Sequence, residues 1–93
     1  MIGMMLTKKR SRIDIVGRIL SVCVRDSLKT SIMYDCNLNH EQVEDYLRLL
    51  VDRGLLEKVE RAPGSRRYVY RLTDLGHKCL EAYKQFAEIL DEP

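Results

Sequence analysis

The sequence predicts a small α+β domain that is mainly helical, with three helices followed by a two-stranded β-hairpin and a final helix. Residues 30–54 have the pattern of a short helix, a tight turn and a longer amphipathic helix. Residues 55–72 have the pattern of two strands that meet at a Pro-Gly turn. A chain of 93 residues is enough for one such domain and buries a modest fraction of its surface.

The first helix is expected from Ser11 to about Arg25. Ser11 suits an N-cap, and Asp14 lies three residues later, as in a capping box with Asp in place of Glu or Gln. Apolar residues then recur at spacings of three and four, which indicates one buried face. They are Ile13, Val16, Ile19, Leu20, Cys23 and Val24. Residues 1–10 precede this helix as a basic N-terminal arm.

A short second helix is expected to begin at Thr30, whose hydroxyl suits an N-cap. Its apolar residues are Ile32, Met33 and Cys36. Residues 37–39 form the turn that follows, and Leu38 is expected to be buried within it.

The third helix is expected to begin after Asn39, because Gln42 three residues later completes a capping box. Gly54 is placed for a left-handed C-cap. The face between these two signals is apolar, with Val43, Tyr46, Leu47, Leu50 and Val51.

The hairpin is expected to pair residues 55–61 with residues 66–72. Residues 62–65 join the strands, and their Pro-Gly pair suits a type II turn. In the second strand one predicted face carries Tyr68, Tyr70 and Leu72, and the other carries Arg67, Val69 and Arg71.

The last helix is expected to be capped by Thr73 and to run to about Asp91. It has more apolar residues than so small a domain can cover, including a stripe of Cys79, Tyr83, Phe86 and Leu90. We therefore expect residues 74–93 to form a homodimer and residues 11–73 to form the domain itself. The alternative is that the first helix folds back over the stripe.

Charge is unevenly distributed although the net charge is only +2. Residues 1–12 hold four basic and no acidic side chains, and so do residues 61–72. Residues 40–60 hold six acidic and three basic side chains. Two separate basic patches are what contact with phosphates requires, although basic patches are also found on ordinary solvated surfaces.

The remaining composition argues against several other classes of protein. No apolar run is long enough to span a membrane, and the apolar start precedes the basic residues, opposite to a secretory signal. A cytoplasmic location is expected, in the nucleoid or in an infected host cell. The spacing of Cys23, Cys36 and Cys79 does not suggest a zinc site, and burial is expected for at least two of them, with a disulfide left open. We predict no catalytic residue, metal or cofactor.

The order of helices and hairpin is that of a winged helix-turn-helix, which places one helix in the DNA major groove and a β-wing on the flanking backbone. Double-stranded DNA is therefore the predicted partner. Helix 40–53 is expected to read bases, the wing at 61–71 to contact backbone or minor groove, and the arm to follow the backbone. The candidate DNA-binding residues are Lys8, Lys9, Arg10, Arg12, Thr30, Ser31, Asn39, His40, Gln42, Arg48, Arg61, Arg66, Arg67 and Arg71.

The third helix also carries four carboxylates, Glu41, Glu44, Asp45 and Asp52, which repel phosphates. A pair between Glu44 and Arg48 is expected to offset part of this repulsion. The acidity leaves two alternatives to sequence-specific binding. The domain can bind another protein, or it can be an architectural chromatin protein with little sequence specificity.

Three stretches carry a resemblance to a known family: RIDIVGRILSVC, TSIMYDCNLNHEQVEDYLRLLVDRGLLEK and YRLTDLGHKCLEAY. Together they resemble the archaeal winged-helix family of small DNA-binding proteins over residues 12–83. That family includes transcription regulators, some of them viral, and coiled-coil dimeric chromatin proteins of thermophiles. The resemblance implies a dimer through the last helix, with the third helix and wing facing DNA and groove contacts at Gln42, Asp45 and Arg48. The shortness of the last helix favours a regulator.

Overall fold

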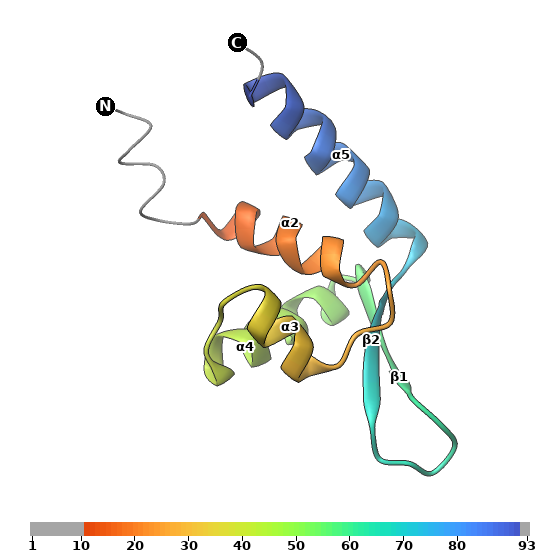
Figure 1. The fold of residues 1–93 in the computed structure, drawn as a ribbon. Coiled ribbons are helices and arrows are strands. Elements are labelled where there is room, and N and C mark those ends of the chain that lie inside the picture. The colour runs from red at the N-terminus through yellow and green to blue at the C-terminus, as the bar shows by residue number, and fades with distance from the viewer. Residues whose placement is uncertain (1–10, 92–93) are drawn as a thin grey trace.

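The computed structural model describes residues 11–91, which form four helices and a two-stranded antiparallel sheet. The predicted fold class is confirmed. The elements are α2 (Arg12–Val22), α3 (Lys29–Asp35), α4 (His40–Asp52), β1 (Leu56–Glu60), β2 (Tyr68–Leu72) and α5 (Asp74–Asp91). Helices α2, α3 and α4 lie together, the hairpin projects to one side, and α5 points away from the hairpin tip (Figure 1).

Helix α2 begins as predicted but buries a different face. The Ser11 hydroxyl accepts a hydrogen bond from the Asp14 amide, so the N-cap is confirmed. The helix ends at Val22, not near Arg25, because the chain must turn there toward the wing. Ile15 belongs to the core, whereas Ile13 is 68 % exposed and lies outside the predicted buried face. Val24 is likewise exposed and not part of that face.

The predicted cap at Thr30 is wrong, because α3 begins at Lys29 with Leu28 in the cap position. The reason is a pairing that is remote in sequence. The backbone of Ser27 exchanges two hydrogen bonds with Tyr70 of β2, at 3.1 and 2.8 Å, and so forms an isolated antiparallel β-bridge beside β2. The chain therefore leaves extended geometry at Leu28, and Thr30 falls inside the first helical turn.

Helix α4 has both of its predicted ends. The Asn39 side chain accepts from the Gln42 amide at 2.7 Å, and the Gln42 side chain accepts from the Asn39 amide at 3.0 Å. At the other end Gly54 has φ +77°, and the amides of Gly54 and Leu55 donate to the carbonyls of Val51 and Leu50. These two bonds form a Schellman motif, for which a left-handed glycine is well suited.

The hairpin has the predicted pairing in shorter strands. Val59 lies opposite Val69, and Leu56 lies opposite Leu72. Strand β1 starts one residue later than predicted, because the Leu55 amide closes α4. Gly64 has φ +74° and the Ser65 amide donates to the Ala62 carbonyl, in agreement with the predicted type II turn.

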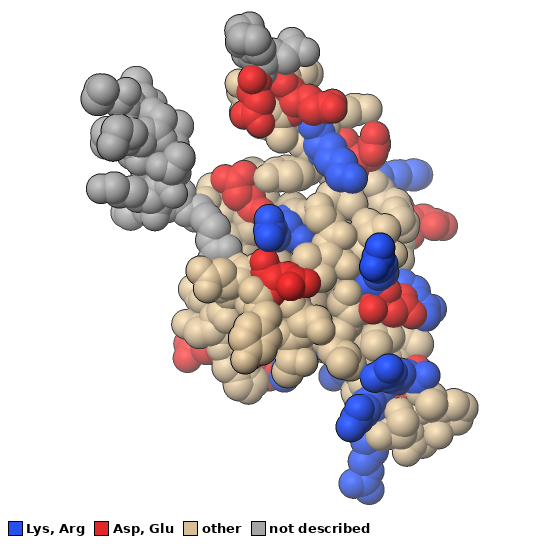
Figure 2. All heavy atoms as spheres, in the orientation of Figure 1, with Lys and Arg blue, Asp and Glu red and all other residues tan. Residues whose placement is uncertain are grey.

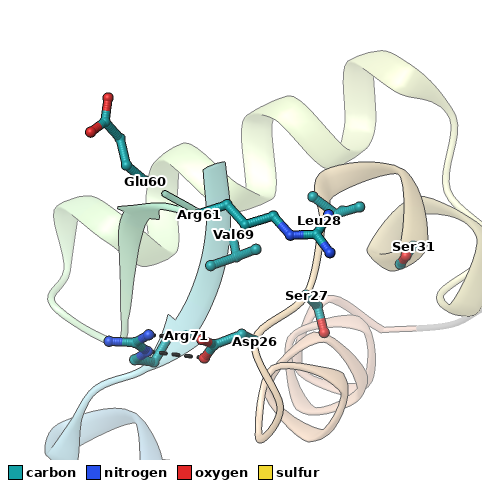
Figure 3. A pocket seen from close by; sticks show the side chains of 8 residues that line it. All are labelled: Asp26, Ser27, Leu28, Ser31, Glu60, Arg61, Val69 and Arg71. Atoms are coloured by element: carbon teal, nitrogen blue, oxygen red, sulfur yellow. Dashed lines mark hydrogen bonds and ion pairs between the residues drawn. The ribbon is translucent and has the colours of Figure 1, made fainter. Parts of the chain in front are cut away.

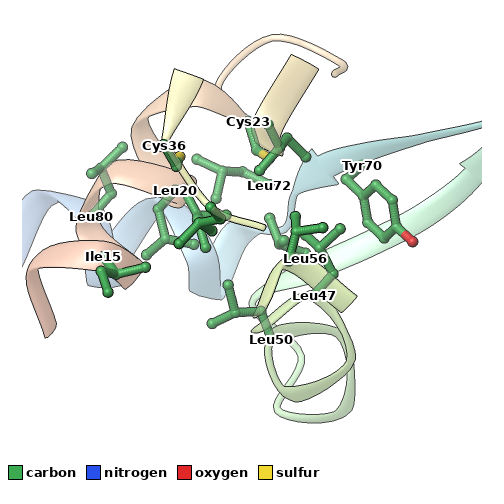
Figure 4. Close-up of a cluster of buried hydrophobic side chains, with 14 residues drawn as sticks. Ile15, Leu20, Cys23, Cys36, Leu47, Leu50, Leu56, Tyr70, Leu72 and Leu80 are labelled. Carbon is green, nitrogen blue, oxygen red and sulfur yellow. The ribbon is translucent and has the colours of Figure 1, made fainter. Parts of the chain in front are cut away.

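One apolar core joins the three-helix unit, the sheet and the start of α5 (Figure 4). Ile19, Ile32 and Val43 are completely buried, one from each of the first three helices. Leu38 is buried in the turn, as predicted. Cys23 and Cys36 are buried, as was expected for two of the cysteines, and burial raises the pKa of the Cys23 thiol to about 12. That thiol therefore stays protonated at neutral pH and acts as a small apolar group.

The start of α5 is attached directly to the end of α4. The Thr73 hydroxyl accepts from the Gly76 amide at 3.0 Å, which confirms the predicted cap, and it donates to the Gly54 carbonyl. The Thr73 amide donates to the Leu55 carbonyl. Gly76 packs so closely on that carbonyl that a Cβ at this position would overlap it.

We expect Thr73→Val to lower the free energy of unfolding by about 1 kcal/mol, because the isosteric side chain loses both hydrogen bonds of the hydroxyl. Urea denaturation followed by circular dichroism measures the change. Thr73→Ser keeps the hydroxyl and is the matched control. Equal stability of the Val and Ser variants would contradict a capping role.

Candidate nucleic-acid interface

Three arginines of the hairpin, which forms the wing, are exposed, and none of them forms an ion pair with a carboxylate among the described residues. They are Arg61, Arg66 and Arg67. The Ser65 hydroxyl orders the tip, since it accepts from the Ala62 and Arg67 amides at 3.3 and 3.2 Å. On the face shown in Figure 2, basic side chains gather along the hairpin and acidic ones near the end of α5. The wing therefore presents uncompensated positive charge.

The fourth wing arginine has a different environment. Arg71 makes a bidentate pair with Asp26 at 2.9 and 2.7 Å and lies 3.6 Å from the Glu57 carboxylate. Hydrogen bonds from Arg71 lower the pKa of the Asp26 carboxyl. The pair ties the loop before α3 to β2, so Arg71 holds the wing in place and has little charge left for a ligand.

A polar cavity of about 370 Å³ lies at the root of the wing (Figure 3). It is bounded by the loop before α3, the start of α3 and both strands, and Ser31 and Arg61 are among its lining residues. Arg61 extends across Val69 toward Leu28, and Glu60 is also among the lining residues. Arg71 is paired with Asp26, so Arg61 is the arginine of this cavity that forms no ion pair with a carboxylate of the described chain.

The exposed side of α4 carries the predicted base-reading residues His40, Gln42 and Arg48. Asn39 and Gln42 are engaged with each other in the capping box, which leaves their side-chain amide groups as the available donors. The expected pair between Glu44 and Arg48 is wrong. Glu44 instead binds Lys29 of α3 at 2.9 Å, because Lys29 lies across the helix interface, and Arg48 lies 3.8 Å from Asp45.

The other candidate residues are dispersed. Thr30 and Ser31 are exposed on α3. Arg12 lies at the start of α2, beside α5, and not near the wing. The proposed arm residues Lys8, Lys9 and Arg10 lie outside the described residues.

Two further exposed residues, one on α3 and one on the wing, were not among the predicted site residues. Tyr34 is 82 % exposed on α3, three residues after Ser31. Its signal was its position outside the apolar spacing of that helix. Lys58 on β1 lies 4.7 Å above the Tyr68 ring and adds a cation on the wing.

The residues of the predicted dimer stripe divide into two groups. Tyr83 packs on Gly17 of α2, and its hydroxyl donates to Asp14 at 3.0 Å. Hydrogen bonds from Ser11 and then Tyr83 lower the pKa of the Asp14 carboxyl. Cys79 is half-buried beside the same helix, so α2 does fold over this part of α5. Phe86 and Leu90 are 61 % and 67 % exposed.

Among residues 11–91, no helix is long and apolar enough to cross a membrane. Within the same residues no group of three His, Cys, Asp or Glu side chains is arranged to hold a metal ion.

Comparison with known proteins gives a family match and several structural relatives. A sequence model described as winged helix-turn-helix matches residues 9–91. An uncharacterized protein of Methanocaldococcus jannaschii is 27% identical over 84 residues, which cover 89% of this chain and 79% of that one. The structure resembles Sso10a-2, a DNA-binding protein from Sulfolobus solfataricus, with a TM-score of 0.78, 24% identity and coverage of 88% and 83%.

A second structural relative is MepR, a transcription regulator of the Staphylococcus aureus multidrug efflux pump MepA. Its TM-score is 0.74 at 18% identity, with 96% of this chain and 66% of that chain covered. A MepR–DNA complex also matches, with a TM-score of 0.72 at 23% identity over 84% of this chain and 67% of that one. At these identities the structural matches establish the fold.

We expect Arg71→Gln to raise the pKa of Asp26 toward its ordinary value, because the largest stabilisation of the carboxylate comes from Arg71. A pH titration of the Asp26 carboxyl carbon by NMR measures it. The lowered pKa in the folded protein means that this pair stabilises the fold above the ordinary Asp pKa. That contribution disappears as pH falls through the folded-state value. Arg66→Gln is the control, and an equal change in both variants would contradict the pairing.

Proposed function

This chain belongs to the winged helix-turn-helix family, and from that premise we propose that it is a dimeric DNA-binding protein that acts as a transcription regulator. The observation that carries the proposal is the wing, where Arg61, Arg66 and Arg67 are exposed without carboxylate partners in the described chain. Such charge attracts a polyanion and is otherwise unfavourable to concentrate. A location at the nucleoid, or on DNA in an infected host cell, follows from this role.

The wing and its root supply backbone contacts. Arg61 and the Ser31 hydroxyl line the same cavity and can hold one phosphate between α3 and the hairpin. Arg66 and Arg67 at the tip reach the flanking backbone or minor groove. Each phosphate contact releases counterions, so this part of the binding is strong at low salt and independent of sequence.

Helix α4 supplies the sequence-dependent part. Gln42 can pair with adenine, Arg48 with guanine, and Glu41 can accept from the cytosine amino group. The carboxylates beside them disfavour close approach to phosphates at wrong positions. We therefore propose that α4 selects the site and that the wing provides most of the affinity. An architectural protein with little specificity is the alternative within the same class.

Relatives of known activity support this proposal. Sso10a-2 is described as a DNA-binding protein, and MepR is described as a transcription regulator and has a structure with DNA. Regulators of this kind bind as dimers at paired half-sites. The exposed Phe86 and Leu90 near the end of α5 support a homodimer here.

The acidic side of α4 favours a second candidate function, a module that binds a protein. Glu41, Asp45 and Asp52 are exposed on α4. Arg48 lies 3.8 Å from the Asp45 carboxylate. A basic partner would be recovered in a pull-down that survives nuclease treatment. Recovery of material that nuclease releases would instead support the DNA-binding role.

Removal of two wing charges should weaken binding to every duplex. For Arg66→Ala with Arg67→Ala we expect the slope of log affinity against log salt to fall by roughly 0.9 for each phosphate that the wing no longer neutralises. Fluorescence anisotropy of a labelled mixed-sequence duplex at several salt concentrations measures the slope. Lys84→Ala, on α5 and outside the hairpin, is the control. No binding by the wild type, even at low salt, would refute the DNA-binding role.

Changes on α4 should act differently. We expect Gln42→Ala and Arg48→Ala to reduce discrimination against altered base pairs by about 1–3 kcal/mol for each bidentate pairing with a base that is removed, with little change in the salt slope. Gln42→Glu, which keeps the cap acceptor, controls for loss of helix stability. Competition binding with single-base variants of a selected site measures the change. Unaltered discrimination would favour the architectural alternative.

A further inference from the structure

The groove between α2 and α5 is an apolar surface that the described residues leave open. It has a volume of about 420 Å³. Ile13 on its α2 side is 68 % exposed, and Cys79 and Tyr83 on its α5 side are half-buried. Val16 and Leu20 of α2 also line it. Contact between apolar walls and water is unfavourable, so this groove suits an apolar occupant.

The chain that precedes Ser11 contains an apolar segment. Residues 1–6 read Met-Ile-Gly-Met-Met-Leu, and residues 7–10 read Thr-Lys-Lys-Arg and join that segment to α2. All ten lie outside the described residues. Methionine is unbranched and flexible, so it fills apolar gaps of irregular shape. The chain therefore contains a segment with the chemistry that the groove requires.

We propose that residues 1–6 bind in the groove between α2 and α5 of their own chain, and that residues 7–10 form the turn that reverses the chain before Ser11. In this arrangement the segment runs antiparallel to α2, from Ile13 toward Leu20, and covers Cys79. The docked segment holds α2 against α5, a role inside the domain that is separate from contact with DNA.

The lengths of the two segments fit the groove. Residues 7–10 span up to about 13 Å when extended, which is enough to turn the chain back beside α2. From Ile13 to Leu20 the helix rises about 10 Å, and six extended residues span up to about 20 Å. Arg12 and Ile13 line the groove directly after Ser11, so the segment is tethered within reach of it. The tether gives a high effective concentration that a second copy or a free ligand lacks.

Charge at one end of the groove favours the proposed direction. The Asp14 carboxylate, in the first turn of α2, accepts a hydrogen bond from the Tyr83 hydroxyl. Burial, this hydrogen bond and the nearby charges of Asp14 and Asp91 raise the pKa of Tyr83. Acidic side chains also gather near the end of α5 (Figure 2). The proposed turn brings the basic residues at positions 8–10 to this acidic end, where opposite charges attract.

The reactivity of Cys79 tests whether the groove is covered. Because the docked segment shields this thiol, Met4→Asp with Met5→Asp should raise its rate of reaction with N-ethylmaleimide several-fold. Mass spectrometry of the Cys79 peptide measures the rate, and the buried Cys23 is an internal reference that reports unfolding. Met4→Leu with Met5→Leu keeps the apolar character and is the matched control, for which we expect the wild-type rate. An unchanged rate in the Asp variant would overturn the proposal.

Crosslinking identifies the occupant of the groove. Oxidation of a Met4→Cys variant with diamide, which takes up the two thiol hydrogens, should join position 4 to Cys79 of the same chain. The product is a monomer on a non-reducing gel. The control is Met4→Cys with Cys79→Ala and Lys84→Cys, which should not crosslink because Lys84 lines a different cavity. A covalent dimer through position 4 and Cys79 would assign the groove to a second copy and overturn the proposal. Absence of the crosslink would also overturn it.

Both measurements use the free protein, so their outcome is separate from that of the DNA titration. A wild type that binds a duplex while its Cys79 reacts as fast as in the Asp variant would refute docking and leave the DNA-binding role in place. A shielded Cys79 with the expected crosslink, in a chain that binds no duplex, would confirm docking and refute the DNA-binding role.

Discussion

The structure depends on the junction where the backbone of Leu55 meets both α4 and α5. The Leu55 amide donates to Leu50 and ends the third helix, while its carbonyl accepts from Thr73 at the start of the last helix. Gly76 packs against the same carbonyl. Strand β1 begins at the next residue and β2 ends just before Thr73. Helix α4, the wing and helix α5 are therefore attached at one place and keep a defined geometry.

The basic side chains of the described residues divide into those that form ion pairs with carboxylates and those that do not. Lys29 holds Glu44, and Arg71 holds Asp26, so these cations serve the fold. The arginines farther along the wing have no such role and are available to a polyanion. This division explains how a chain with a net charge of only +2 can present a basic surface. It also makes the acidic surface of α4 compatible with the proposed DNA binding, because the wing supplies the attraction in that proposal.

The features that sequence predicted correctly are those whose partners lie close together in the chain. The pair Asn39–Gln42 and the glycine at position 54 are local signals, and both were found. The errors come from contacts that are remote in sequence. The bridge between Ser27 and Tyr70 moved the start of α3, and the bond between Tyr83 and Asp14 spans 69 residues.

In the candidate site, too, local features could be predicted from the sequence and contacts between remote residues could not. Exposure of the arginines at the wing tip could be predicted from the turn that carries them. The capture of Arg71 by Asp26, 45 residues away, could not. Helical spacing also allowed either Ile13 or Ile15 to face the core, because each has apolar residues three to four positions away. The folded chain buries Ile15 in the common core and leaves Ile13 at the groove between α2 and α5, and this choice depends on packing that no local pattern encodes.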